Sequence, residues 1–147
     1  MNNTSAISPS RVTASGKALT TSLWVAQTIL ALVFLMSGGM KVAASTEALR
    51  AQMPWVNGAL GSAVRMIGFV EILGAIGIVL PAATRIAPKL TPVASLGLAL
   101  VMALASITHL SRGELSMVPV TMTLGGLAVF VAWGRFGRAA VPPRARS

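Results

Sequence analysis

Four long apolar stretches, separated by short polar segments, dominate the pattern of hydrophobic and polar positions along the chain. They cover residues 22–42, 64–80, 90–110 and 117–136. A helix that crosses a bilayer needs about 20 mostly apolar residues, within a range of about 17–25, and each stretch falls in that range. The pattern therefore predicts an all-α integral membrane protein, a four-helix bundle with a single domain over residues 22–136.

The polar links between the stretches carry signals of turns and of interfacial structure. In the first link, residues 45–50 are expected to form a short interfacial helix that Pro54 ends, and Trp55 suits the boundary between water and lipid. In the second link, Pro81 and Pro88 bracket a short basic segment. We expect neither neighbouring helix to continue past these prolines, because proline removes a backbone donor and disfavours helix in the residue before it.

Polar residues make up both ends of the chain. Residues 1–21 are expected to form a flexible lead-in, and residues 137–147 a disordered basic tail. A signal peptide is the alternative for the first apolar stretch, because Arg11 and Lys17 precede it and small residues follow it. The apolar core of this stretch is longer than the roughly 7–15 residues usual in a signal sequence, which favours a retained helix and four spans.

Composition agrees with a membrane protein and excludes several other classes. Hydrophobic residues make up 54% of the 147 residues and charged residues 10%, whereas soluble domains carry about 25% charged residues. A soluble chain this short buries too little of its surface to hide so much apolar area, and a disordered chain contains far less of it. Cysteine is absent and histidine occurs once, so we expect no metal site, disulfide or iron–sulfur cluster within one chain.

The formal net charge of +9, from 12 Lys and Arg against 3 Asp and Glu, predicts how the helices are oriented. Four spans place eight of the basic residues on one side of the membrane and four on the other. Cytoplasmic loops carry the excess of Lys and Arg, so both the N-terminus and the C-terminus are expected to be cytoplasmic. The basic residues are dispersed and no nucleic-acid-binding motif accompanies them, so nucleic acid is not an expected partner.

Ionisable residues within membrane segments are costly and mark candidate functional sites. The candidates form an intramembrane polar site of Lys41, Arg65, Glu71 and His109. The topology brings them towards one leaflet, because Lys41 ends the first span, Arg65 begins the second and His109 ends the third. Glu71 lies further along the second span, at a depth of about 9 Å beyond Arg65 in a helix. Gln27 is a further polar candidate, and it lies towards the other leaflet.

Glu71 is the most informative of these residues, because its carboxylate projects from a helix face of small residues. Gly68 and Gly74 share that face through their i, i+3 spacing. A carboxylate that faces the bundle can pair with Lys41, Arg65 or His109. Glu71 is therefore either half of a structural ion pair or a carboxylate that accepts protons or binds a ligand. Gly38 and Gly77 complete the set of glycines expected at close helix contacts.

Several of these residues form motifs in a defined order. The motifs are Gly38-x-x-Lys41, Gly68-x-x-Glu71-x-x-Gly74, Leu90-Thr91-Pro92-Val93-Ala94, then His109 with Arg112-Gly113-Glu114, and finally Gly134-Arg135-Phe136. This set resembles the DoxX-like family of small four-helix membrane proteins. The resemblance implies a multi-pass protein of the bacterial inner membrane. It also maps the Lys, Glu and His positions of the family onto Lys41, Glu71 and His109.

The resemblance further implies a connection to redox chemistry, since the family name comes from a subunit of a quinone-linked thiosulfate-oxidising enzyme. The first hypothesis is an accessory or quinone-proximal subunit of a membrane redox system. It would not be catalytic on its own, would bind quinone without a covalent bond, and would need a redox partner subunit. The alternatives are a small proton-coupled transporter that acts as a homo-oligomer and a non-catalytic membrane scaffold or assembly factor. In each case the lipid bilayer is an expected partner.

Overall fold

The computed structural model describes residues 9–144, and it describes the side chains of residues 16–57 and 60–144. This part of the chain contains α1 (Pro9–Ala43), α2 (Thr46–Gln52), α3 (Gly58–Thr84), α4 (Leu90–Ser111) and α5 (Val118–Phe136). No strand occurs among residues 9–144, so the predicted all-α class is confirmed.

Four of the helices are long and apolar enough to span a membrane. The qualifying segments are Gly16–Ala43, Leu60–Thr84, Leu90–Ser111 and Val118–Phe136, which confirms the four predicted spans. The outward faces of these helices expose large apolar side chains, and examples are Met36, Leu73 and Leu100. Such faces are unfavourable in water and match the hydrocarbon of a bilayer, so the bundle is in contact with lipid.

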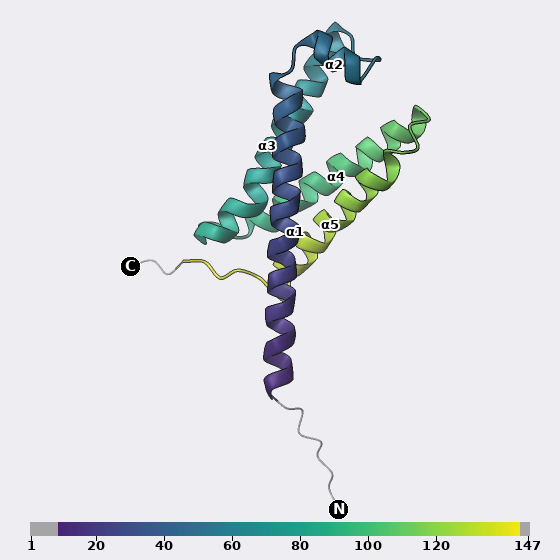
Figure 1. The fold of residues 1–147 in the computed structure, drawn as a ribbon. Helices are drawn as coiled ribbons and strands as arrows, with labels where there is room; N and C mark the ends of the chain where they lie inside the picture. Colours follow the sequence, from purple (N-terminus) through teal and green to yellow (C-terminus); the bar gives the residue numbers. More distant parts are fainter. Residues whose placement is uncertain (1–8, 145–147) are drawn as a thin grey trace, which may run out of the picture.

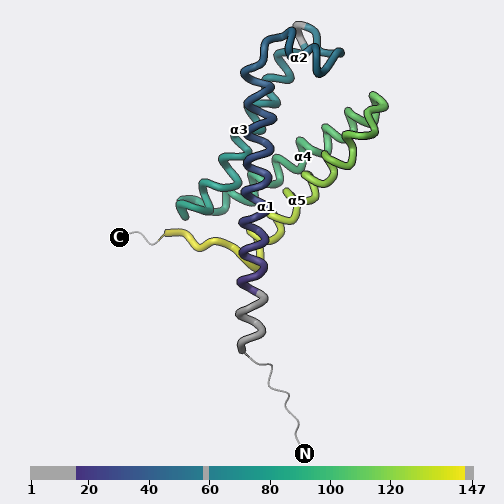
Figure 2. Tube along the Cα trace, viewed as in Figure 1, coloured from purple at the N-terminus to yellow at the C-terminus, as the bar shows by residue number. Residues whose placement is uncertain are grey.

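In the view of Figure 1 the long helix α1 runs down the middle and crosses in front of the other long helices. It packs against α3 and α5, while α4 packs against both α3 and α5. Towards the end of the molecule that carries α2, the α4–α5 hairpin diverges from α1 (Figure 2). The link that follows α2 bridges this divergence, because the Trp55 ring lies 4.0 Å from the guanidinium of Arg112, which follows α4.

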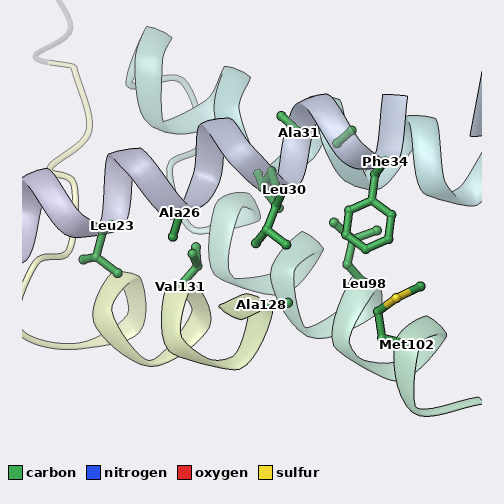
Figure 3. Close-up of a cluster of buried hydrophobic side chains, with 11 residues drawn as sticks. Leu23, Ala26, Leu30, Ala31, Phe34, Leu98, Met102, Ala128 and Val131 are labelled. Carbon is green, nitrogen blue, oxygen red and sulfur yellow. The ribbon is translucent and has the colours of Figure 1, made fainter. Parts of the chain in front are cut away.

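The main apolar core lies where α1 faces α4 and α5. Figure 3 shows Leu30 and Phe34 of α1 directed at these helices, close to Leu98 and Val131. All four side chains are fully buried. Lipid chains are as apolar as these residues, so close van der Waals packing rather than removal from water stabilises the contact between the helices.

Glycines allow the closest helix contacts. A Cβ atom added to Gly38 of α1 would lie 2.6 Å from the carbonyl oxygen of Gly68 of α3, and one added to Gly68 would lie 2.8 Å from the carbonyl oxygen of Gly38. Gly74 and Gly77 lie in a similar way against side chains of α4. All four glycines noted in the sequence thus lie at contacts that a larger residue would obstruct.

The first link folds into the short helix α2, as expected. Ser45 caps it, because the Ser45 hydroxyl accepts a hydrogen bond from the Ala48 N–H at 3.1 Å. Leu49 is fully buried in a small apolar cluster with Val56. The pKa of Glu47 in the first turn is lowered, chiefly by a hydrogen bond from its own backbone N–H and then by one from the Ser45 hydroxyl. A carboxylate at this position also suits the positive end of the helix dipole.

The second span is longer than predicted at both ends. It begins at Gly58, nearly two turns earlier, where the Asn57 side chain caps the helix. The prediction that the helix stops at Pro81 is wrong, because α3 continues to Thr84 and ends at Arg85, whose φ of 59° is left-handed. Proline removes one backbone donor, here the one that would bond the Gly77 carbonyl, and membrane helices tolerate such a loss. In the last turn of α3, the Thr84 hydroxyl donates to the Leu80 carbonyl at 2.8 Å.

The two ends of the chain also differ from expectation. The expected flexible lead-in is wrong for residues 9–21, because α1 begins at Pro9. Proline suits the first turn of a helix, and no second proline follows before the apolar stretch. Residues 137–144 of the expected disordered tail form no helix, yet the Arg144 N–H donates to the Arg85 carbonyl at 3.1 Å. Residues 1–8 and 145–147 lie outside the described residues.

Candidate functional site

A cavity of about 360 Å³ lies where the α4–α5 hairpin diverges from α1 and α3. All four spanning helices contribute to its lining. Most of the lining is apolar and includes Phe34, Met102 and Leu124. Met53 and Trp55, from the link after α2, complete it. The cavity therefore offers an apolar interior at the end of the bundle where the predicted polar residues converge.

Lys41 and Glu71 form a buried ion pair on the α1–α3 side of this cavity. The Lys41 Nζ lies 2.7 and 2.6 Å from the two carboxylate oxygens of Glu71, and it donates to the Ser37 hydroxyl at 2.6 Å. The side chain of Glu71 is 2% exposed and that of Lys41 is 18% exposed. Charge-assisted hydrogen bonds are strong where little water reaches them, so this pair fixes α1 against α3.

His109 and Glu114 form a second polar pair, on the α4 side of the same cavity. The Nδ1 atom of His109 lies 2.6 Å from the Oε2 atom of Glu114. The turn after α4 creates this contact. Gly113 adopts a φ of 72°, which glycine tolerates, and the Glu114 N–H donates to the His109 carbonyl at 2.9 Å. Because the carboxylate holds Nδ1, the Nε2 atom is the ring nitrogen that can meet a ligand.

The other cations at this end have different contacts. Arg65 donates from Nη2 to the Ala44 carbonyl at 3.1 Å and is not among the residues that line the cavity. Arg112 lies over the Trp55 ring, and this cation–π contact joins the turn after α4 to the link after α2. Of the four residues predicted for the polar site, three line one cavity, and Arg65 does not.

A second buried polar cluster lies at the opposite end of the bundle. The Oε1 atom of Gln27 accepts a hydrogen bond from the Arg135 Nε at 2.8 Å, and the Gln27 Nε2 donates to the Ile78 carbonyl. Arg135 is only 5% exposed, and its guanidinium lies 5.0 Å from the centre of the Trp24 ring. From the sequence, Arg135 counted towards the charge of the basic side and belonged to the Gly134-Arg135-Phe136 motif, and its contact with Gln27 was not predicted. The available signal was that Gln27 and Arg135 lie at similar depth in antiparallel helices.

The cavity that Lys41, Glu71 and His109 line can bind a molecule with one polar and one apolar end. The Lys41–Glu71 ion pair and the His109–Glu114 pair supply hydrogen-bond donors and acceptors, and the remaining lining supplies apolar contact. Ligand sites in proteins commonly combine mostly apolar walls with a few polar groups in this way, at volumes of about 300–1,000 Å³. The position of the cavity within a spanning bundle favours a ligand that dissolves in the membrane.

Comparison with known proteins agrees with this architecture. A family model described as the DoxX-like family matches residues 25–131, a range that includes Lys41, Glu71 and His109. No curated protein and no solved structure matches the chain. The match covers more than half of the chain and most of the four apolar helices, so this multi-pass membrane protein belongs to the DoxX-like family.

Proposed function

We propose that this DoxX-like protein binds a quinone in the cavity lined by Lys41, Glu71 and His109, as an accessory subunit of a redox system in the bacterial inner membrane. The observation that supports the proposal is the division of the cavity lining into two hydrogen-bonded polar pairs and a set of apolar side chains. A quinone has the same division. Its ring carries carbonyl oxygens that accept hydrogen bonds, and its apolar tail remains in lipid.

The hydrogen bonds already present favour His109 as the first contact of the quinone ring. Lys41 has three N–H donors, and its Nζ already lies within hydrogen-bond distance of Ser37 and both oxygens of Glu71. The imidazolium form of His109, held at Nδ1 by Glu114, presents an Nε2–H donor to a carbonyl oxygen. Lys41 can contact the second carbonyl only by exchanging its bond to Ser37.

The accessory role requires a partner, because the sequence offers no residues for an electron-transfer centre. With no cysteine and one histidine, the chain has no thiolates for an iron–sulfur cluster and no pair of histidines for a haem. We therefore expect affinity purification in a mild detergent to return a second subunit that carries a redox cofactor. Recovery of this chain alone would contradict the accessory role, and quinone binding would still be tested separately.

The tryptophans allow a direct test of quinone binding. Trp55 lines the cavity, whereas Trp133 is exposed on the outer surface of the bundle. Quinones quench tryptophan fluorescence on contact, so decylubiquinone is titrated into protein held in phosphatidylcholine nanodiscs. A Trp24→Phe/Trp133→Phe variant reports on Trp55 alone, and a Trp24→Phe/Trp55→Phe variant reports on Trp133 alone. We expect saturable quenching of Trp55 and only non-saturating quenching of Trp133, which samples quinone dissolved in lipid.

A pair of matched variants tests whether the polar end of the cavity binds the ring. Glu114→Gln removes the charged partner of His109, and we expect about tenfold weaker binding, because a hydrogen bond to a charged group contributes about 1.5–3 kcal/mol. Glu47→Gln removes an exposed carboxylate of α2, outside the cavity, and should leave binding unchanged. Equal effects of the two substitutions, or equal quenching of the two tryptophans, would contradict quinone binding in this cavity.

A further inference from the structure

A basic groove lies at the end of the bundle opposite the Lys41–Glu71 pair. It has a volume of about 860 Å³ and lies between α1, the last turn of α3 and the end of α5. Residues 139–142, from the segment after α5, form part of its lining. The Arg144 N–H donates to the Arg85 carbonyl at 3.1 Å, which holds this segment across the groove. The folded chain thus encloses the groove on several sides.

Four cations line the groove, and no acidic side chain among the described residues lies beside them. The cations are Lys17, Arg85, Arg135 and Arg138. The whole sequence contains only three acidic residues, and these lie in α2, in the Lys41 ion pair and in the turn after α4, at the other end of the bundle. Like charges that face one space repel each other, and a region of low dielectric strengthens the repulsion. The groove therefore favours an anion from outside the chain.

Arg135 supplies a second, independent observation. Its side chain is 95% buried, at 5% exposure, and its known hydrogen-bond partners, the Gln27 Oε1 atom and the Ala139 carbonyl, are neutral. Among the described residues, the Arg135 Nη2 atom has no hydrogen-bond partner. A buried cation without a counter-charge is costly. Because Arg135 also lines the basic groove, an anion bound there would compensate its charge.

An apolar groove continues from the basic groove along the surface of the bundle. Thr21 lines both grooves. The second groove has a volume of about 330 Å³ and runs between α1 and α5, past Val25, Ile29 and Phe130. An anionic head group beside an apolar channel of this kind matches the shape of a phospholipid. Basic pockets between transmembrane helices on the cytoplasmic side are known to bind lipid head groups.

We propose that the basic groove binds a phosphate group, and that the adjoining apolar groove selects a phosphate carried by an anionic lipid over free inorganic phosphate. Arg135 provides the buried charge at its base, and Lys17 and Arg138 provide exposed charges at its rim. The site is independent of the quinone cavity, since the two lie at opposite ends of the bundle. In the orientation predicted from Lys and Arg counts, the groove faces the cytoplasmic leaflet.

The test compares lipid retention by the purified full chain. The protein, in a mild detergent, is mixed with equal amounts of dimyristoyl phosphatidylglycerol and dimyristoyl phosphatidylcholine, and bound lipid is counted by native mass spectrometry. We expect one phosphatidylglycerol per chain, preferred at least tenfold. Lys17→Gln and Arg138→Gln should each weaken its binding about fivefold. Both side chains are exposed, so these substitutions should not disturb folding.

Lys89→Gln is the matched control, because Lys89 is an exposed cation at the same end of the bundle that does not line the groove. It should change retention by less than twofold. Equal retention of the two lipids, or an effect of Lys89→Gln as large as that of Lys17→Gln, would overturn the proposal. Added inorganic phosphate distinguishes the two sources. If millimolar phosphate alone raises the melting temperature as much as phosphatidylglycerol does, the phosphate site stands and its ligand is free phosphate.

Discussion

Gly38→Ala is the substitution whose effect follows most directly from the structure. The added methyl carbon would lie 2.6 Å from the Gly68 carbonyl oxygen and 2.9 Å from the Cγ1 atom of Ile72. Carbon and oxygen atoms in helix contacts lie about 3.3–3.6 Å apart, so α1 and α3 have to separate by roughly 0.7 Å at this crossing. The contact involves the backbone of α3, which cannot rotate away as a flexible side chain can.

The neighbouring Gly39 supplies a control for the same substitution. A Cβ atom added to Gly39 meets nothing within 4 Å. Both substitutions gain the better helix propensity of alanine, about 1 kcal/mol, so this contribution cancels when the two variants are compared. The difference that remains is the cost of overpacking, about 1–3 kcal/mol. Gly39→Ala should therefore match or exceed the stability of the wild type, and Gly38→Ala should be the less stable variant by that amount.

The free energy of unfolding is measured by titrating the purified protein from a mild detergent into sodium dodecyl sulfate, with tryptophan fluorescence as the signal. Separation at Gly38 should also disturb the ion pair between Lys41 and Glu71, because Lys41 lies one helical turn after Gly38. Quinone quenching of Trp55 should therefore weaken in Gly38→Ala and not in Gly39→Ala. Equal unfolding free energies for the two variants would refute the conclusion that the α1–α3 crossing depends on glycine.

Four further outcomes are expected. Gln27→Leu should lower the free energy of unfolding by about 1.5–3 kcal/mol in the same titration, because the Arg135 guanidinium loses one of its two hydrogen-bond partners. A change below about 0.5 kcal/mol would contradict a structural role. Glu71→Gln should lower the free energy of unfolding by about 3–5 kcal/mol, since it leaves the largely buried Lys41 cation without its counter-charge. Lys41→Met/Glu71→Met should recover most of that stability. If the double variant also keeps quinone binding, the pair is structural only. The chain contains no cysteine, so Glu47→Cys should react with a membrane-impermeant maleimide in spheroplasts and Lys89→Cys only after lysis; the reverse result would invert the predicted orientation. The pKa of Glu47 is lowered in the folded chain. Its ionised carboxylate therefore stabilises α2 above the ordinary pKa of a glutamate, and this stabilisation is lost as pH falls through the lowered value. Amide exchange in α2 should accelerate over that pH range, while amide exchange in α4 does not.

The spans could be predicted from the sequence because lipid exposure leaves a long uninterrupted apolar signal. The third span was predicted at residues 90–110 and the helix covers Leu90–Ser111. The second span was predicted less well, and the reason lies in the rules applied to proline. Proline usually ends a helix in water, where the freed backbone groups can bond to solvent, whereas membrane helices tolerate it, and α3 continues through Pro81 to Thr84.

The contacts between polar residues were harder to predict than their positions. The convergence of Lys41 and Glu71 follows from antiparallel topology and depth. Which of the nearby ionisable residues pair with each other does not follow from them. His109 pairs with Glu114 rather than Glu71, because a turn at Gly113 brings Glu114 back towards α4. Such a contact depends on the geometry of one turn, and no residue spacing along a helix reports it.

Arg135 shows a different limit of sequence reasoning. A basic residue at the end of a span is usually exposed and contributes to orientation, and eight residues were interpreted in that way. The burial of Arg135 arises from α1, which brings Gln27 and Trp24 beside it from more than 100 residues away in the sequence. The rule that cytoplasmic ends carry Lys and Arg treats Arg135 and the exposed Arg138 alike. Only the packing of the first span against the last distinguishes the two.

The polar clusters at the two ends of the bundle have a shared consequence for its stability. In lipid, apolar helices gain little from association itself, so small residues and polar contacts determine which faces meet. Lys41 fixes α1 against α3 at one end through Glu71, and Gln27 fixes α1 against α3 and α5 at the other through Ile78 and Arg135. A ligand in the cavity lined by Lys41 and Glu71 would contact that ion pair, and a ligand in the basic groove would contact Arg135. Both contacts exist only in the folded bundle. By linkage, each ligand should then raise the free energy of unfolding as its concentration exceeds its dissociation constant, and the two increments should add, because the sites share no residue.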